Sequence, residues 1–239
     1  MTGRQLAWRL LFTLLACEPA SAGSFAVNPV RVSLSAKNNS GVLVVRNDDT
    51  KSSVVQIEVV AWTQQDGKEV HTATRDILAT PPIFTVAPGH SQIVRVGLRH
   101  APDAEREVAY RVILQEVPPL PTGSNALQVA LRLSVPVFVL PATPMSPVLE
   151  WHAFRNAKGQ LSVSLDNTGK AHIQIVNFSL SSAAGSQPAV KQHVAAYVLP
   201  QQHREWAVQT TVPAGKNLRL IAVTDAGDRK ADIVVEDRP

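Results

Sequence analysis

Short apolar runs separated by turn residues dominate the chain, and they favour strands over helices. The segments 42–45, 54–62, 93–96 and 108–117 are rich in valine and isoleucine, and Gly, Pro and Asn-Asp turns separate them. Runs of β-branched residues at such a spacing are typical of a β-sandwich. No long segment carries the apolar spacing of an amphipathic helix. The pattern therefore predicts an all-β fold.

A proline-rich segment divides this pattern in two. Residues 140–147 (LPATPMSP) contain three prolines, which restrict the backbone and form a semi-rigid connector. Alternation resumes after it, at 161–165 and 172–180, and 239 residues suffice for two sandwich domains. We predict three parts after residue 22: an N-terminal domain at 23–141, a proline-rich linker at 142–149 and a C-terminal domain at 150–239.

The first 22 residues are interpreted as a signal peptide. Two arginines precede a short apolar run at 10–16, and Ala-Ser-Ala at 20–22 forms a cleavage motif. The run is too short to span a bilayer, and we expect no membrane insertion. The only cysteine, Cys17, follows Leu-Leu-Ala, so a lipoprotein box that keeps a lipidated Cys17 remains a second interpretation. After cleavage at residue 22 the chain has no cysteine and no disulfide.

The clearest alternation lies at 126–139 (ALQVALRLSVPVFV). Its apolar side chains share one face of the predicted strand: Leu127, Val129, Leu131 and Leu133. Pro136 has no N–H for a ladder hydrogen bond, which predicts a sheet edge or a bulge there. Alternation of this kind usually means that one face packs on the domain's own core, and that interpretation remains open beside the one given below.

Several motifs follow one another in an order that resembles a known family. They are SFAVNPVRVSL at 24–34, ATPPIFTVAPG at 79–89, SQIVRVGL at 91–98 and YRVILQEVPP at 110–119. This order is similar to that of the periplasmic chaperones of the chaperone–usher pilus pathway, and the short loop at 117–125 is similar to that of a divergent, short-loop type. The resemblance implies two immunoglobulin-like β-sandwich domains set at an angle with a cleft between them.

The resemblance also implies a function. Chaperones of this family fold and cap pilus subunits by lending them an edge strand, and deliver them to an outer-membrane usher. It implies a periplasmic location, pilus subunits and the usher as partners, and no enzymatic activity. The residues Leu127, Val129 and Leu131 match the family's groove-filling positions, and Leu133 extends the row.

Two further sets of residues are implied by the resemblance. The family holds the subunit's terminal carboxylate with two basic residues, of which the first matches Arg31. The second is often a lysine, but its position here is Pro136; Arg111 is the preferred substitute and Arg132 the second. A family salt bridge between the domains is matched by Glu107 and Asp225, although its arginine position is occupied by Leu140.

The remaining composition excludes other classes. The net charge is +4, but Lys and Arg are scattered, so we expect no nucleic-acid partner. There is no Gly-x-Ser-x-Gly elbow and no phosphate-binding glycine loop. The seven histidines are dispersed and are interpreted as surface or turn residues. We therefore expect no catalytic residue, no metal and no cofactor.

One alternative function stays open. The chain could be a structural pilus or adhesin protein built of immunoglobulin-like domains. A structural subunit usually has one domain and carries its own N-terminal donor extension. Two domains and an edge strand beside a basic anchor favour the chaperone.

Overall fold

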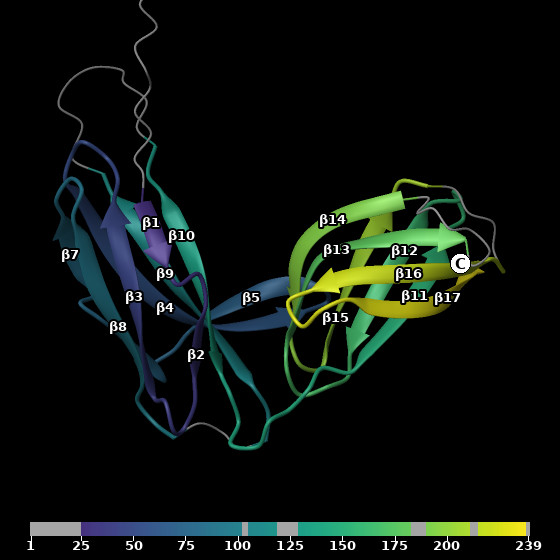
Figure 1. The fold of residues 1–239 in the computed structure, drawn as a ribbon, viewed down its shortest axis with the longest axis horizontal. Coiled ribbons are helices and arrows are strands. Elements are labelled where there is room, and N and C mark those ends of the chain that lie inside the picture. The colour runs from purple at the N-terminus through teal and green to yellow at the C-terminus, as the bar shows by residue number, and fades with distance from the viewer. Residues whose placement is uncertain (1–24, 102–104, 119–128, 183–189, 211–214, 238–239) are drawn as a thin grey trace, which may run out of the picture.

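The computed structural model describes residues 25–101, 105–118, 129–182, 190–210 and 215–237, and within these ranges every regular element is a strand. Figure 1 shows two lobes of strands joined by one crossing of the chain. The prediction of an all-β chain with two sandwich domains is confirmed. The predicted signal peptide, Cys17, Leu127 and most of the 117–125 loop lie outside the described residues.

The described residues of the first domain form ten strands in two sheets. They are β1 (Phe25–Asn28), β2 (Val32–Leu34), β3 (Ser40–Asn47), β4 (Ser53–Gln65), β5 (Lys68–Ala73), β6 (Ile77–Thr80), β7 (Ile83–Val86), β8 (Ser91–Leu98), β9 (Val108–Val117) and β10 (Arg132–Val139). One sheet has the order β1-β3-β8-β6, and the other has the order β2-β10-β9-β4-β5, with β7 also paired to β4.

The core of this domain follows from period-two alternation. In β3, Leu43 and Val45 are buried, while the alternate residues Val42, Val44 and Arg46 are less buried and face outward. The facing sheet contributes Val112 of β9 and Val137 of β10, both fully buried in the same cluster. Successive side chains of a strand point to opposite faces, so each sheet has one apolar inner face and one outer face. In the six-stranded sheet, the outer face is the one that bears the candidate site.

The N-terminal strand changes sheets. β1 pairs with β3 in the four-stranded sheet, whereas β2 pairs in parallel with β10 in the other sheet. The chain crosses between the two layers at residues 29–31. Arg31 thus lies in this crossover, immediately before β2.

Seven strands lie in the part of the second domain that the structure describes: β11 (Leu149–Arg155), β12 (Leu161–Asn167), β13 (Ile173–Ser182), β14 (Val190–Val198), β15 (Gln202–Val208), β16 (Asn217–Thr224) and β17 (Arg229–Asp237). Their order is β14-β13-β16-β17-β11-β12-β15. β17 pairs with β16 over most of its length and with β11 at its end, so it connects the two layers. The core between these layers includes Phe178, Leu165 and Leu220.

One buried asparagine organises a turn in each domain. Asn47 donates its amide hydrogens to the carbonyls of Lys51 and Val86. Asn167 does the same toward Ala171 and Val198, and its side-chain oxygen accepts the N–H of Gly169. Buried polar groups must be satisfied by hydrogen bonds, so each asparagine fixes the chain around it. In the second domain this fixes the segment that precedes His172.

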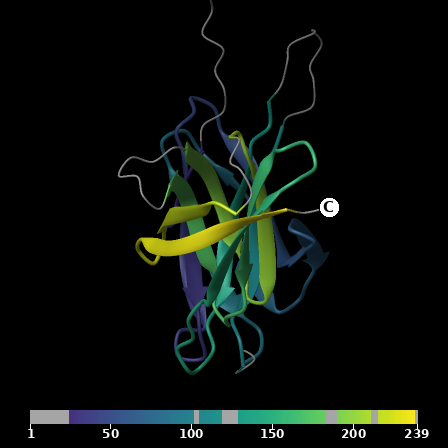
Figure 2. The same ribbon diagram turned by 90° about the vertical axis from the view of Figure 1, so that its right-hand side faces the viewer.

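The two domains contact each other through the hairpin of β4 and β5 and through the outer face of β9 and β10. In Figure 1 the β4–β5 hairpin extends from the first lobe toward β14 and β15, and in Figure 2 the second domain lies in front of the first. Gln64 in this hairpin donates to the carbonyl of Tyr197 (2.9 Å) and accepts from the N–H of Leu199 (3.0 Å). The buried side chains of Trp62, Phe138 and Leu199 form a small apolar cluster at the same junction.

Candidate functional site

β10 has one paired edge and one partly open edge. Its whole length pairs with β9, but β2 covers the opposite edge only at Val137–Val139. No described strand pairs with that edge over residues 132–136. The Glu116 N–H donates to the Leu131 carbonyl on the β9 side, and alternate residues of an antiparallel strand point their backbone groups to opposite edges. The N–H and C=O groups of Arg132 and Ser134 are therefore directed toward the open edge.

This arrangement explains the proline in the strand. Pro136 lies two residues after Ser134 and four after Arg132, so its backbone points to the same edge as theirs. The N–H that proline lacks would therefore have pointed to the open edge and not to β9. The ladder with β9 continues through the register pair Pro136 and Arg111. The prediction of a sheet edge at Pro136 is confirmed.

The apolar side chains that alternate from Val129 to Val135 become progressively more buried along the chain. Val129 is 60% exposed, Leu131 and Leu133 are half-buried, and Val135 is buried. Leu133 packs against the core cluster of the first domain. The strand begins at Arg132, later than the predicted start, and Val129 and Leu131 precede it. Val129 and Leu131 thus have apolar surface that is accessible to a partner, while part of the Leu133 side chain is buried against its own domain.

Arg31, Pro136 and Arg111 lie in one row across three adjacent strands. Pro136 is opposite Arg111, and Val137 is opposite Val32, so one residue back along the same register Arg31 lies beside Pro136. Val32 faces the core, so Arg31 lies on the outer face, as Arg111 does. With neighbouring strands about 4.8 Å apart, the Cα atoms of the two arginines are separated by roughly 10 Å. The two arginines therefore flank the position where the family lysine is missing.

Arg31 already holds a carboxylate of the second domain. Its Nη1 lies 2.6 Å from Oδ2 of Asp225, and the two side chains are 41% and 21% exposed. Burial alone would raise the pKa of Asp225, but hydrogen bonds from His172, the Gln174 N–H and Arg31 outweigh it and lower that pKa to about 2. The Asp225 carboxylate is thus ionised at neutral pH and bridges the domains.

Arg111 is fixed from two sides. Its guanidinium carbon lies 3.7 Å from the centre of the Trp62 ring, which provides a flat cation–π platform. Its Nη2 lies 3.3 Å from Oε1 of Glu69, and Arg204 of the second domain approaches the same oxygen at 3.3 Å. Burial lowers the pKa of Arg111 from its usual value, Glu69 opposes this, and the charge of Arg204 adds to it. Sequence reasoning named Arg111 but missed Glu69 and Arg204.

Tyr197 links the two arginines. Burial raises the pKa of its phenol, and so does Asp225, while Arg31 and Arg111 both act in the opposite direction. Its ring lies 5.5 Å from that of Trp62 in an edge-to-face contact. Arg31 and Arg111 therefore both act on one tyrosine of the second domain. Two arginines so placed suit a carboxylate, because arginine remains charged and can donate two parallel hydrogen bonds.

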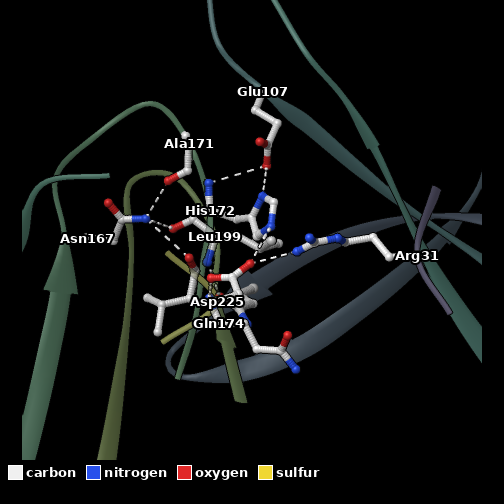
Figure 3. Close-up of polar contacts among 10 residues, drawn as sticks. Arg31, Glu107, Asn167, Ala171, His172, Gln174, Leu199 and Asp225 are labelled. Carbon is white, nitrogen blue, oxygen red and sulfur yellow. Dashed lines mark hydrogen bonds and ion pairs between the residues drawn. The ribbon is translucent and has the colours of Figure 1, made fainter. Parts of the chain in front are cut away.

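A largely buried histidine, His172, completes the contact between the domains (Figure 3). Nδ1 of His172 lies 2.6 Å from Oε1 of Glu107, and its Nε2 lies 3.7 Å from Oδ2 of Asp225. Its ring stacks on Phe138 with 3.5 Å between the ring centres. Burial lowers the pKa of His172, but hydrogen bonds to Asp225 and Glu107 raise it further than burial lowers it.

The structure thus brings the predicted Glu107 and Asp225 together, but through a residue that the sequence did not reveal. The interpretation of the histidines as surface or turn residues is wrong for His172, whose side chain is 12% exposed. His172 supplies the cation between the two acidic residues, while Leu140, at the family's arginine position, is 38% exposed. The alternation of 172–180 indicated a strand. Periodicity cannot show, however, that His172 at its start contacts the other domain.

Other kinds of site find no support in the described part of the chain. No group of three or more His, Cys, Asp or Glu side chains within it could hold a metal ion. No helix long and apolar enough to cross a membrane occurs among the same residues.

Comparison with known proteins agrees with this geometry. Residues 24–144, just over half of the chain, match the family described as pili and flagellar-assembly chaperone, PapD N-terminal domain. The chain therefore belongs to the pilus-assembly chaperones.

Two curated relatives come from Escherichia coli. The uncharacterized fimbrial chaperone YcbF of strain K12 is 24% identical over 184 residues, which cover 75% of this chain and 77% of YcbF. The chaperone protein PapD is 33% identical over 87 residues, 34% of this chain and 35% of PapD. The resemblance seen in the sequence motifs is thus confirmed by similarity over three quarters of the chain in YcbF and over one third of it in PapD.

Solved structures share the fold. A chain of the CsuC–CsuE chaperone–tip adhesion subunit pre-assembly complex of Acinetobacter baumannii is 20% identical, with a TM-score of 0.66 over 90% of this chain and 100% of that chain. A chain from the Salmonella enterica complex of the SafA pilin with the SafB chaperone is 17% identical, with a TM-score of 0.61 over 90% of this chain and 97% of that chain. Both establish the architecture of two immunoglobulin-like domains at an angle.

Proposed function

We propose that this chaperone caps pilus subunits by adding its β10 edge to their unfinished sandwich. The observation that carries the proposal is the open edge at residues 132–136, which ends where β2 begins. An unpaired edge invites another strand, and main-chain hydrogen bonds of this kind are the basis of β-augmentation. The exposed side chain of Val129 and the half-buried side chain of Leu131 supply apolar contacts beside those hydrogen bonds.

The charges at the end of the edge favour one direction for the added strand. A strand on this edge must stop at Arg31, because β2 occupies the edge from Val137 onward. A strand parallel to β10, as β2 is, presents its carboxyl end there, and an antiparallel strand presents its amino end. Arg31 and Arg111 attract a carboxylate and repel an ammonium group. The subunit's last strand therefore runs parallel to β10, with its terminal carboxylate near the two arginines.

The proposal also includes the location and the second partner of this chain. As a member of this family, it would act in the periplasm, without catalysis, and transfer its subunit to an outer-membrane usher. The signal peptide expected at residues 1–22 agrees with export. The absence of a catalytic motif in the sequence agrees with a binding function.

Co-expression with a pilus subunit tests the proposal. We expect a soluble one-to-one complex in the periplasm and aggregation of the subunit when the chaperone is omitted. Mass spectrometry of the complex and size-exclusion chromatography measure both. Polymerisation of this chain by itself, without subunit capture, would instead identify it as a structural pilus or adhesin protein.

A further inference from the structure

The two domains share a cation that can lose its charge near neutral pH. Glu107 belongs to the first domain and Asp225 to the second, and Figure 3 shows the imidazole of His172 between their carboxylates. Nδ1 lies 2.6 Å from Glu107, and Nε2 lies 3.7 Å from Asp225. Only the imidazolium form of histidine can donate from both ring nitrogens. The contact with both carboxylates is therefore complete only while His172 is protonated.

Loss of that proton would leave a buried carboxylate without its counter-charge. Asp225 would keep Arg31, which lies 2.6 Å away. Glu107 has no such reserve, because in the described part of the chain the only cation paired with it is His172, and its side chain is 2% exposed. An unpaired carboxylate is costly to bury. Deprotonation of His172 would therefore favour an arrangement of the domains in which Glu107 reaches water.

Space for such a rearrangement lies directly beside Glu107. A cavity of about 340 Å³ lies between the two domains and the proline-rich connection that joins them. Glu107, Leu140, Pro141 and Ala171 are among the residues that line it. Tight packing would hold the domains together without the charge, but this side of Glu107 is not tightly packed. Leu140 is also the position of the family's arginine, so a permanent cation is replaced here by a cavity and a histidine.

We propose that His172 is a pH-dependent latch between the domains: its imidazolium holds them in one orientation, and its deprotonation lets them move about the linker. The proton passes to solvent, and no covalent bond changes. The pKa of His172 is raised above 6.5, so the latch is closed below pH 6.5 and opens as the pH rises through that raised pKa. A partner that contacts both domains would bind the open form more weakly, because it must also restore the orientation.

The groups that face His172 all lie on other elements, and their charges set the direction of the switch. They are Glu107 before β9, Phe138 of β10, Tyr197 of β14, Asp225 after β16 and, through its ion pair with Asp225, Arg31 before β2. The two carboxylates favour the charged imidazole, and burial opposes them. An arginine at position 140 would stay charged throughout the same range of pH. The pH dependence thus comes from the use of histidine in its place.

NMR of the chain purified from residue 23 onward can follow the orientation and the proton together. Residual dipolar couplings of the backbone amides give an alignment tensor for each domain, and the imidazole resonances give the protonation of each histidine. From about pH 5.5 to the midpoint of His172, one tensor should fit both domains. Above that midpoint we expect two tensors of unequal magnitude, because the domains then move separately. A common tensor at a pH where His172 is deprotonated would overturn the latch.

The linkage can also be measured at the histidine itself. Glu107→Gln and Asp225→Asn should each move the titration midpoint of His172 to lower pH, because each removes a charge that favours the imidazolium. The internal control is His152, which lies 3.4 Å from Asp166 on the surface of the second domain, and its midpoint should stay where it is. A His172 midpoint that neither variant moves would overturn the latch.

Variants at two positions fix the latch open or closed. His172→Gln should give two tensors at every pH. Leu140→Arg places a permanent cation beside Glu107 and should give one tensor at every pH, whereas Leu140→Met keeps an apolar side chain and should retain the pH dependence. His71→Gln removes another histidine near the contact with the second domain, 3.8 Å from Glu69, and should also retain it. Full pH dependence in Leu140→Arg, or its loss in His71→Gln, would overturn the assignment of the latch to His172.

Discussion

Nδ1 of His172 lies 2.6 Å from Oε1 of Glu107, and this largely buried contact joins the second domain to the first. The side chain of Glu107 is 2% exposed and that of His172 is 12% exposed. Glu107 also accepts the backbone N–H of His172, and its own N–H donates to the carbonyl of Lys170. The contact thus fixes both a side chain and the loop that carries it, and with them the angle at which the two domains meet.

Removing one partner of this pair should loosen the interface. His172→Gln keeps a hydrogen-bond donor but removes the charge and the ring that stacks on Phe138. We expect a loss of about 2–4 kcal/mol in the free energy of unfolding, since breaking a buried pair leaves a charge without its partner. Chemical denaturation measures the loss, and small-angle X-ray scattering should show a wider spread of domain orientations. His193→Gln, in strand β14 of the same domain, is the control and should leave both measurements unchanged.

The same cluster predicts a dependence of stability on pH. The pKa of His172 is raised above 6.5 in the folded chain, so its contribution is complete below pH 6.5 and is lost as the pH rises through the raised pKa. The pKa of Asp225 is lowered from 3.8 to about 2, so its contribution is complete above pH 3.8 and is lost as the pH falls toward 2. Both contributions coincide between about pH 4 and 6.5.

The groups that face His172 define the control for this pH dependence. They are Glu107 before β9, Asp225 after β16 with Arg31 bound to it, and the rings of Phe138 and Tyr197. In the His172→Gln variant the fall in stability above pH 6.5 should disappear, while the fall at acid pH should become smaller, because His172 is one of the groups that lower the pKa of Asp225. Urea denaturation at a series of pH values measures both. An unchanged fall above pH 6.5 in the variant would show that another group causes it.

A glycine beside the linker should tolerate no side chain. A Cβ atom on Gly169 would lie 2.4 Å from the N atom of Val148 and 2.5 Å from the carbonyl oxygen of Ser146. Both are backbone atoms of the connection between the domains, so they cannot rotate away. We expect Gly169→Ala to destabilise the chain by about 1–3 kcal/mol. Gly97→Ala is the matched control, because its Cβ would meet its nearest neighbour at an ordinary 3.6 Å; equal losses would contradict the steric argument.

The sequence predicted the strands because alternation is a local property. The row at 127–133, the edge at Pro136 and the strand at 172–180 all follow from residues a few positions apart. The family motifs added Arg31, Glu107 and Asp225, which the structure brings to one junction. Arg111 was named as a substitute from its strand alone, and the register confirms that it lies opposite Pro136.

The remaining partners depend on how two separately folded domains meet, which no local pattern encodes. His172 and Arg204 are ordinary polar positions in the second domain until β9 and the β4–β5 hairpin approach them. Glu69 follows an Asp-Gly turn and resembles any charged hairpin residue. The sequence contained one indication of a missing basic residue. Because Leu140 occupies the family's arginine position, Glu107 and Asp225 needed a cation from elsewhere. That deficit indicates that a cation is needed, but only the structure shows that His172 supplies it.

Loss of Arg31 should affect capture far more than folding. Its ion pair with Asp225 is partly exposed, at 41% for Arg31, so Arg31→Ala should cost only about 0.5–1 kcal/mol of stability. Capture of a co-expressed pilus subunit should fall at least tenfold, because the incoming carboxylate loses its first anchor. Arg219→Ala breaks a comparable surface pair with Asp232 and should leave capture intact. A loss of capture in both variants would indicate a general effect of charge.

The edge strand is tested most directly at Leu131, the half-buried residue at which the donor row leaves the core. Its backbone is held at both ends by Glu116, which accepts the Leu131 N–H at 3.2 Å and donates its own N–H to the Leu131 carbonyl at 2.9 Å. The position of the side chain is therefore fixed before any subunit arrives. A carboxylate there cannot enter an apolar groove without a large desolvation penalty.

We therefore expect Leu131→Asp to abolish subunit capture while the chain remains folded. Co-purification measures capture, and circular dichroism with thermal unfolding verifies the fold. Val234→Asp is the control, because Val234 is a 51% exposed valine on β17 of the second domain, away from the open edge. Leu131→Met, which keeps apolar volume, should retain most of the capture. If Leu131→Asp captured subunits as well as the Val234 control, the β10 edge could not be the surface that completes the subunit's sandwich.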